Sequence, residues 1–114
     1  MATKLFYNPK CSKCREAKDL LEGESCEFEI IEYLKEIPNA KELKEILKML
    51  KMKAVDLIRK SEPIFKTEYA DKNFSNHEWI KVMVKHPILI ERPILIHDNK
   101  AIIGRPPSKI IELI

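Results

Sequence analysis

Cys11 and Cys14 form a Cys-x-x-Cys motif directly after a short apolar segment. The run Lys4–Tyr7 predicts a buried strand, and Asn8-Pro9 ends it before a helix expected to begin at Cys11 or Ser12. Free N–H groups and the helix dipole at a helix N-terminus stabilise a thiolate and lower the pKa of a cysteine. We therefore expect Cys11 to be an exposed, activated nucleophile. Cys14, one turn along the same face, could reach its sulfur as a resolving thiol.

A structural metal is a weaker interpretation of the same motif. A zinc site would need two further ligands. The remaining cysteine and the histidines show no paired spacing; they are Cys26, His77, His86 and His97. We expect no metal, and we expect Cys26 to be a packing residue at the start of a strand.

Arginine is scarce in this lysine-rich chain, which has 17 lysines and four arginines. Lysines Lys10 and Lys13, with Arg15, add positive charge near the cysteine motif. Arg92-Pro93 and Arg105-Pro106 bracket a predicted hairpin, and a proline just before a strand invites a cis peptide there. These two arginines could converge on an oxyanion near Cys11, although base rates alone favour ordinary surface arginines.

The order of predicted elements is β-α-β, a helical insert, then β-β-α. Capping boxes at Asn39/Glu42 and Ser75/Glu78 begin helices in the insert, and Asp98-Asn99 turns the hairpin. The predicted strands cover residues 4–7, 28–33, 93–97 and 100–103, and the first helix ends near residue 23. This order is that of an α/β thioredoxin-like fold with a small mixed sheet. We expect one domain over residues 1–114, with the insert at about 38–87.

Composition restricts the function classes. The 21 basic and 18 acidic side chains leave a net charge of +3, and lysines alternate with acids along the expected helices, which argues against direct nucleic-acid binding. No apolar run approaches the roughly 18 residues of a membrane span, and the first residues lack the apolar segment of a signal peptide. With three cysteines, a disulfide scaffold is not expected. We expect a reduced, cytoplasmic protein.

Four blocks of sequence, in order along the chain, carry a resemblance. They are Tyr7–Arg15, Leu57–Lys60, His86–Ile94 and Gly104–Pro106. Together they resemble the glutaredoxin-coupled arsenate reductase family of the arsenate reductase/Spx superfamily, which has a thioredoxin-like fold with a helical insert. The resemblance implies that Cys11 attacks arsenate. It also implies that Arg59, Arg92 and Arg105 hold the oxyanion.

Two positions depart from the better-known members of that family. Those members carry no cysteine at the position of Cys14, and some have a histidine at that of Tyr7. A Cys-x-x-Cys is typical of the Spx-type regulators, which bind RNA polymerase but generally lack the motif Gly104-Arg105-Pro106.

These observations together predict an arsenate reductase with no bound cofactor, metal or flavin. Its electrons would come from glutathione and glutaredoxin, from thioredoxin, or through Cys14. The alternatives are an Spx-like redox switch and a thiol–disulfide oxidoreductase acting on another substrate.

Overall fold

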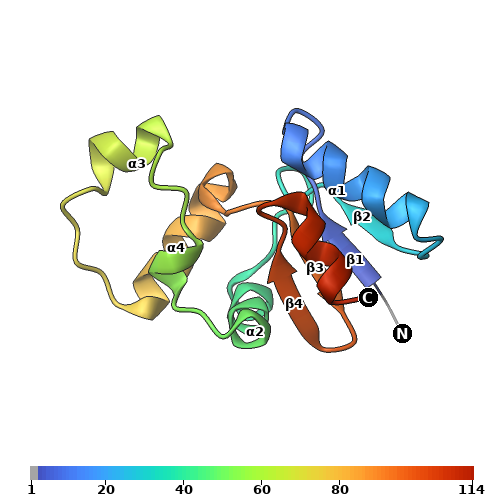
Figure 1. Ribbon diagram of the computed structural model, residues 1–114. Coiled ribbons are helices and arrows are strands. Elements are labelled where there is room, and N and C mark those ends of the chain that lie inside the picture. The colour runs from blue at the N-terminus through green and yellow to red at the C-terminus, as the bar shows by residue number, and fades with distance from the viewer. Residues whose placement is uncertain (1–2) are drawn as a thin grey trace. The chain divides into compact units, whose positions relative to one another are not determined.

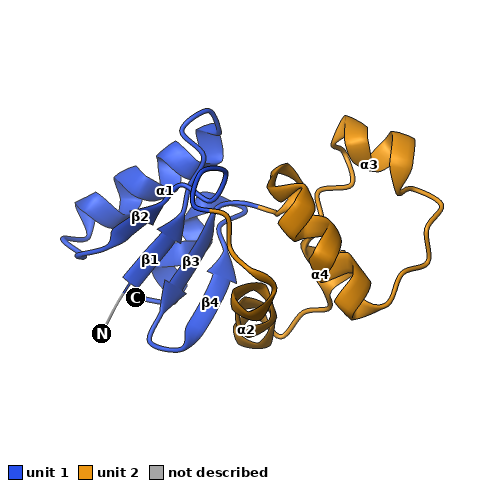
Figure 2. Cartoon of the chain, turned by 180° about the vertical axis from the view of Figure 1, so that it is seen from behind, with its two compact units in different colours: residues 1–36, 92–114 blue, residues 37–91 orange. Residues whose placement is uncertain are grey.

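A computed structural model describes residues 3–114. The first two residues of the segment in which we expect no signal peptide lie outside the described residues. The chain divides into two compact units (Figure 2). We call residues 1–36 and 92–114 the sheet unit, and residues 37–91 the helical unit. That the whole chain acts as one domain stays a prediction. No helix within residues 3–114 is long and apolar enough to cross a lipid bilayer.

The sheet unit is built on four strands in the order β2-β1-β3-β4 (Figure 1). β1 pairs in parallel with β2 and antiparallel with β3, and β3 pairs antiparallel with β4. The elements of the unit are β1 (Thr3–Phe6), α1 (Ser12–Gly23), β2 (Glu29–Ile31), β3 (Ile94–His97), β4 (Lys100–Ile103) and η3 (Pro107–Glu112). The predicted α/β order and mixed sheet are confirmed.

One face of the sheet carries the core of this unit. Leu5 of β1 lies opposite Leu95 of β3, and both side chains are fully buried. Ala17 and Leu21 of α1 and Ile110 of η3 pack against them. Because side chains alternate between the two faces of a strand, Phe6 points to the other face, where its ring stacks on Tyr33 with the centroids 6.1 Å apart. The paired strands thus hold the start of α1 in a fixed place.

Three local details follow from backbone chemistry. Asp98 and Asn99 have φ values of 49° and 65°, which the predicted two-residue turn requires. The first helix ends at Gly23 as expected, but the left-handed position after it belongs to Ser25, with φ 54°. The last helix is a 3₁₀ helix that ends at Glu112. The apolar spacing at the end of the chain predicts that Ile110, Ile111 and Ile114 face inward. For Ile114 this prediction is wrong, because its side chain lies beyond that helix and is 37% exposed.

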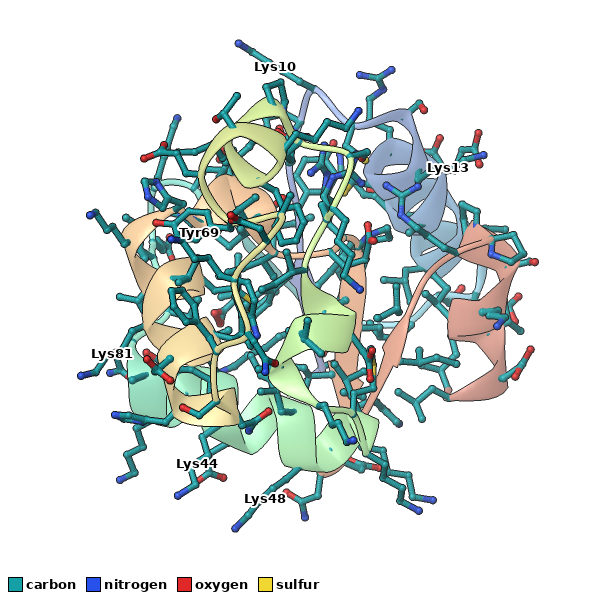
Figure 3. The ribbon with its side chains drawn as sticks, turned by 90° about the vertical axis from the view of Figure 1, so that its left-hand side faces the viewer. Lys10, Lys13, Lys44, Lys48, Tyr69 and Lys81 are labelled. Atoms are coloured by element: carbon teal, nitrogen blue, oxygen red, sulfur yellow. The ribbon has the colours of Figure 1, made fainter. Side chains whose placement is uncertain are left out.

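The helical unit contains two capped helices that pack on each other. The side chains of Asn39 and Ser75 each accept a hydrogen bond from the backbone N–H three residues on. The carboxylates of Glu42 and Glu78 in turn accept the backbone N–H of these two cap residues, so both predicted capping boxes are confirmed. The elements are α2 (Ala40–Leu50), η1 (Ala54–Leu57), α3 (Pro63–Glu68), α4 (Asn76–Lys85) and η2 (Pro87–Leu89). Figure 3 shows Lys44 and Lys48 extending outward from α2. That solvated face agrees with the alternating charge pattern.

A short backbone pairing joins two distant segments of the helical unit. Ile58 and Ile90 form an isolated antiparallel bridge. The N–H of Arg59 donates to the carbonyl of Leu89 at 2.7 Å, and that of Glu91 donates to the carbonyl of Leu57 at 2.9 Å. The pairing therefore sets the register between the segment around Arg59 and the segment that ends at Glu91.

Candidate active site

The loop between β1 and α1 presents Cys11 at the helix N-terminus. Asn8, which is buried, accepts the backbone N–H of Cys11 on its carbonyl at 2.9 Å and that of Lys10 on its Oδ1 at 3.0 Å. This turn places Cys11 at the N-cap of α1 with extended backbone, and its carbonyl accepts the N–H of Arg15 at 3.1 Å. The Cys11 sulfur therefore sits where the unpaired N–H groups of a helix gather.

The surroundings of Cys11 favour its thiolate. Burial is the largest single effect and raises the pKa of this thiol, but the others together outweigh it. The backbone N–H and thiol of Cys14 and the guanidinium of Arg92 interact with the Cys11 sulfur and lower its pKa below the ordinary value. Cys11 is only 8% exposed, so the expectation of an exposed thiol is wrong, whereas the expected activation has a physical cause.

Cys14 lies in the opposite environment. Its side chain is fully buried at the third helical position of α1. Burial raises the pKa of the Cys14 thiol to about 12, and the neighbouring Cys11 sulfur adds to the rise. The two thiols of the motif are therefore shifted in opposite directions, so that Cys11 ionises at a lower pH than Cys14.

Arg92 and Arg105 reach the Cys11 sulfur from the ends of the hairpin. Nη2 of Arg105 lies 4.0 Å from Sγ of Cys11, and Nε of Arg105 donates a hydrogen bond to the carbonyl of Arg92 at 2.7 Å. Arg92 supplies the positive charge that acts on the thiolate. The expected cis peptide before Pro93 is present, and the peptide before Pro106 is cis as well. Two guanidinium groups and the Cys11 sulfur thus meet in the sheet unit.

Close packing at Gly104 holds the ends of the hairpin together. Its N–H donates to the carbonyl of Pro93 at 2.9 Å. A Cβ at this position would lie 2.9 Å from Cγ of Pro93 and 3.0 Å from Cγ2 of Ile110, closer than such atoms pack. Glycine therefore lets the chain pass here and carry Arg105 toward Cys11 without a shift of Pro93 or Ile110.

Lys10 and Arg15 contribute less to the positive charge around the Cys11 sulfur than the sequence suggests. Lys10 extends away from the protein (Figure 3). Arg15 is exposed, and its Nη1 donates to the carbonyl of Pro9 at 2.9 Å. Arg15 therefore stabilises the backbone of the loop, and the positive charge that acts on the Cys11 sulfur comes from Arg92.

Arg59 lies in the helical unit, where two carboxylates contact it. Its Nη1 is 2.9 Å from Oε1 of Glu91, and its Nε is 3.6 Å from Oε2 of Glu62. Its participation in oxyanion binding stays a prediction.

Two residues in these contacts were not singled out from the sequence. Asn8 could have been found, because an Asn-Pro pair is a turn signal and its side chain commonly bonds the backbone two residues on. Glu91 could not, because its contact with Arg59 depends on a backbone pairing across 32 positions of sequence. Within residues 3–114, no three His, Cys, Asp or Glu side chains gather as metal ligands do.

Comparisons with known proteins agree with this arrangement. The model of the ArsC family matches residues 6–113. Protein YfgD of Escherichia coli, described as uncharacterized, is 39% identical over 97% of this chain and 95% of its own length. An arsenate reductase of Neisseria meningitidis is 37% identical, with 94% and 93% covered.

Structural similarity points the same way. The arsenate reductase of Vibrio cholerae matches with a TM-score of 0.94 and 34% identity, over 100% of this chain and 98% of its own. The thioredoxin-like fold is therefore confirmed. Nothing in these comparisons favours an Spx-type regulator.

Proposed function

Because the chain belongs to the ArsC family, we propose that Cys11 of this arsenate reductase-like thiol oxidoreductase attacks an arsenate oxyanion held by arginines. The observation that carries the proposal is the meeting of a stabilised thiolate with two guanidinium groups. Arg105 lies 4.0 Å from the Cys11 sulfur, and Arg92 lowers the pKa of that thiol. A thiolate beside two fixed cations is suited to attack an anionic electrophile, since the cations offset the repulsion between nucleophile and substrate.

In the first step the Cys11 sulfur forms a bond to arsenic(V). The bond from arsenic to one arsenate hydroxyl breaks as that hydroxyl gains a proton and leaves as water. Arsenic stays pentavalent in this adduct. Arg92 and Arg105 neutralise the remaining oxygens as charge redistributes on them. Arg59 is proposed as the third oxyanion ligand, and this assignment is supported by the family membership and by its guanidinium chemistry.

In the second step another thiol attacks the Cys11 sulfur. A sulfur–sulfur bond forms, the sulfur–arsenic bond breaks, and its electron pair reduces arsenic(V) to arsenic(III), which leaves as arsenite. The resulting disulfide then needs two electrons from a thiol donor. Glutathione with glutaredoxin, or thioredoxin, is the proposed donor.

Cys14 is the proposed resolving thiol in one version of this step. It lies one turn along the same helix, and its sulfur interacts with that of Cys11. Adduct formation removes the Cys11 thiolate charge, which is one of the effects that raise the pKa of Cys14. Ionisation of Cys14 therefore becomes less costly when a resolving thiol is needed. In the other version, glutathione attacks Cys11 directly and Cys14 only packs.

The deciding experiment is arsenite formation from arsenate by the purified protein. The donor systems glutathione–glutaredoxin and thioredoxin are compared, with Cys11→Ser as the inactive variant and Cys26→Ser as the control. We expect turnover with at least one system and none in Cys11→Ser. Absence of arsenite with both donor systems would overturn arsenate as the substrate and favour thiol–disulfide exchange on another one.

A further inference from the structure

The Arg59 guanidinium is held by a partly buried ion pair. Its Nη1 donates to Oε1 of Glu91 at 2.9 Å, and Nε lies 3.6 Å from Oε2 of Glu62. The side chains of Arg59 and Glu91 are 18% and 24% exposed. Because both groups are largely screened from water, this contact is stronger and better fixed than an ordinary surface ion pair.

Backbone register explains why Glu91 meets Arg59. In the antiparallel pairing around Ile58 and Ile90, Arg59 lies opposite Leu89, so Glu91 is its diagonal neighbour. Long side chains at diagonal positions, roughly 7–8 Å apart, reach one another. The backbone pairing by itself therefore places the Glu91 side chain within reach of the Arg59 side chain.

Glu62 arrives by a local turn. Its N–H donates to the carbonyl of Arg59 at 3.2 Å, which brings its carboxylate back toward the guanidinium. A guanidinium carries five N–H donors in one plane. Glu91 and Glu62 contact Nη1 and Nε, so the two donors of Nη2 lie outside both contacts. Because these two contacts hold the Arg59 guanidinium in one orientation, its side chain loses less conformational freedom when it binds an anion.

We propose that Glu91 is a positioning residue, which orients the Arg59 guanidinium for the substrate oxyanion. The proposal rests on the proposed function of Arg59 as an oxyanion ligand. Glu91 has an opposing effect as well, because its negative charge repels an anion. Removal of the carboxylate therefore distinguishes the two: KM rises if orientation dominates and falls if repulsion dominates.

The test compares Glu91→Ala with Glu91→Gln in steady-state arsenate reduction. We expect Glu91→Ala to raise the KM for arsenate about tenfold while kcat changes by less than about threefold, as loss of one charge-assisted contact would do. Glu91→Gln keeps an acceptor oxygen and should restore KM to within about threefold. Two variants that both lower KM, or both leave it unchanged, would overturn the positioning role.

A double-mutant cycle tests whether Glu91 acts through Arg59. If it does, Glu91→Ala adds little to KM in the background of Arg59→Ala. Independent, additive effects would overturn the inference. If Arg59→Ala alone leaves KM unchanged, the proposed role of Arg59 fails and the inference fails with it. Glu45→Ala, at an exposed position of α2, is the matched control and should change nothing.

A binding measurement separates these outcomes from a failure of arsenate reduction itself. The rise in Tm caused by arsenate or sulfate is compared in the native protein, Glu91→Ala and Glu91→Gln. We expect Glu91→Ala to lose part of the rise and Glu91→Gln to keep it. Equal rises in all three proteins would contradict the inference, whichever substrate the enzyme turns over. A lower Tm without anion in Glu91→Ala, with an unchanged anion-induced rise, would assign Glu91 a purely structural role.

Discussion

Nη2 of Arg105 lies 4.0 Å from Sγ of Cys11, although the two residues are 94 positions apart. Nε of the same guanidinium donates to the carbonyl of Arg92 at 2.7 Å. One arginine therefore both faces the nucleophile and anchors the backbone of the second arginine. This hydrogen bond ties the Arg105 guanidinium to the backbone of Arg92, and it leads to the first two predictions.

Cys11 should react as a thiolate at a lower pH than a free cysteine. Interactions with Cys14 and Arg92 outweigh burial and lower its pKa below the ordinary value of a cysteine thiol. The rate of iodoacetamide alkylation, followed by mass spectrometry against pH, should have its midpoint below that value. In Arg92→Ala the midpoint should move to higher pH, since a stabilising cation is gone. A Cys11 that alkylates no faster than an exposed model thiol at neutral pH would contradict the nucleophile assignment.

Lysine should not replace Arg105. Arg105→Lys keeps the charge but loses the planar fork and the hydrogen bond from Nε to the Arg92 carbonyl. We expect the KM for arsenate to rise by about tenfold or more and the sulfate-induced rise in Tm to shrink. Arg15→Lys is the control, because that exposed side chain only braces the Pro9 carbonyl. Equal sulfate-induced rises in Tm in the native protein and in an Arg92→Ala, Arg105→Ala double variant would show that these arginines do not form an anion-binding site.

Cys14 should determine how the Cys11 adduct is resolved. If Cys14 attacks, one turnover without glutathione leaves a Cys11–Cys14 disulfide, and Cys14→Ser stalls as the arsenic adduct; both products are visible by intact-mass spectrometry. Burial, which raises the pKa of Cys14 to about 12, also predicts that this intramolecular step speeds up as pH rises. Full glutathione-dependent turnover by Cys14→Ser, with no disulfide in the native protein, would make Cys14 a packing residue.

The two glycines of the chain should respond oppositely to alanine. Gly104→Ala places a Cβ 2.9 Å from Pro93 and 3.0 Å from Ile110, so we expect a loss of about 1–3 kcal/mol in the free energy of unfolding. Gly23→Ala meets nothing within 4 Å at the end of α1 and should be neutral or stabilise by up to about 1 kcal/mol. Urea unfolding measures both. If Gly104→Ala is as stable as the native protein, the ends of the hairpin can move apart to accommodate a Cβ at no cost in stability, and the prediction is wrong.

Local patterns were sufficient to predict most elements of the fold. The Asn39 and Ser75 capping boxes, the turn at Asp98-Asn99 and the helix after Asn8-Pro9 all depend on residues only a few positions apart. Such signals act through short hydrogen bonds and allowed φ values, which neighbours in sequence decide. The end of the chain was less predictable. There the pattern allowed Ile114 an inward position that the short 3₁₀ helix does not provide.

The sequence by itself determined which groups could do chemistry here: a cysteine at the start of a helix, and arginines in a chain that otherwise uses lysine. Only the tertiary structure decided which of them act on the sulfur. The pairing of β1 with β3 and the close approach at Gly104 bring Arg92 and Arg105 to Cys11, while Lys10 extends away. The physical reason is that a pKa and an ion pair depend on distance and burial in space. Contacts between residues 32 or 94 positions apart exist only once the strands have paired.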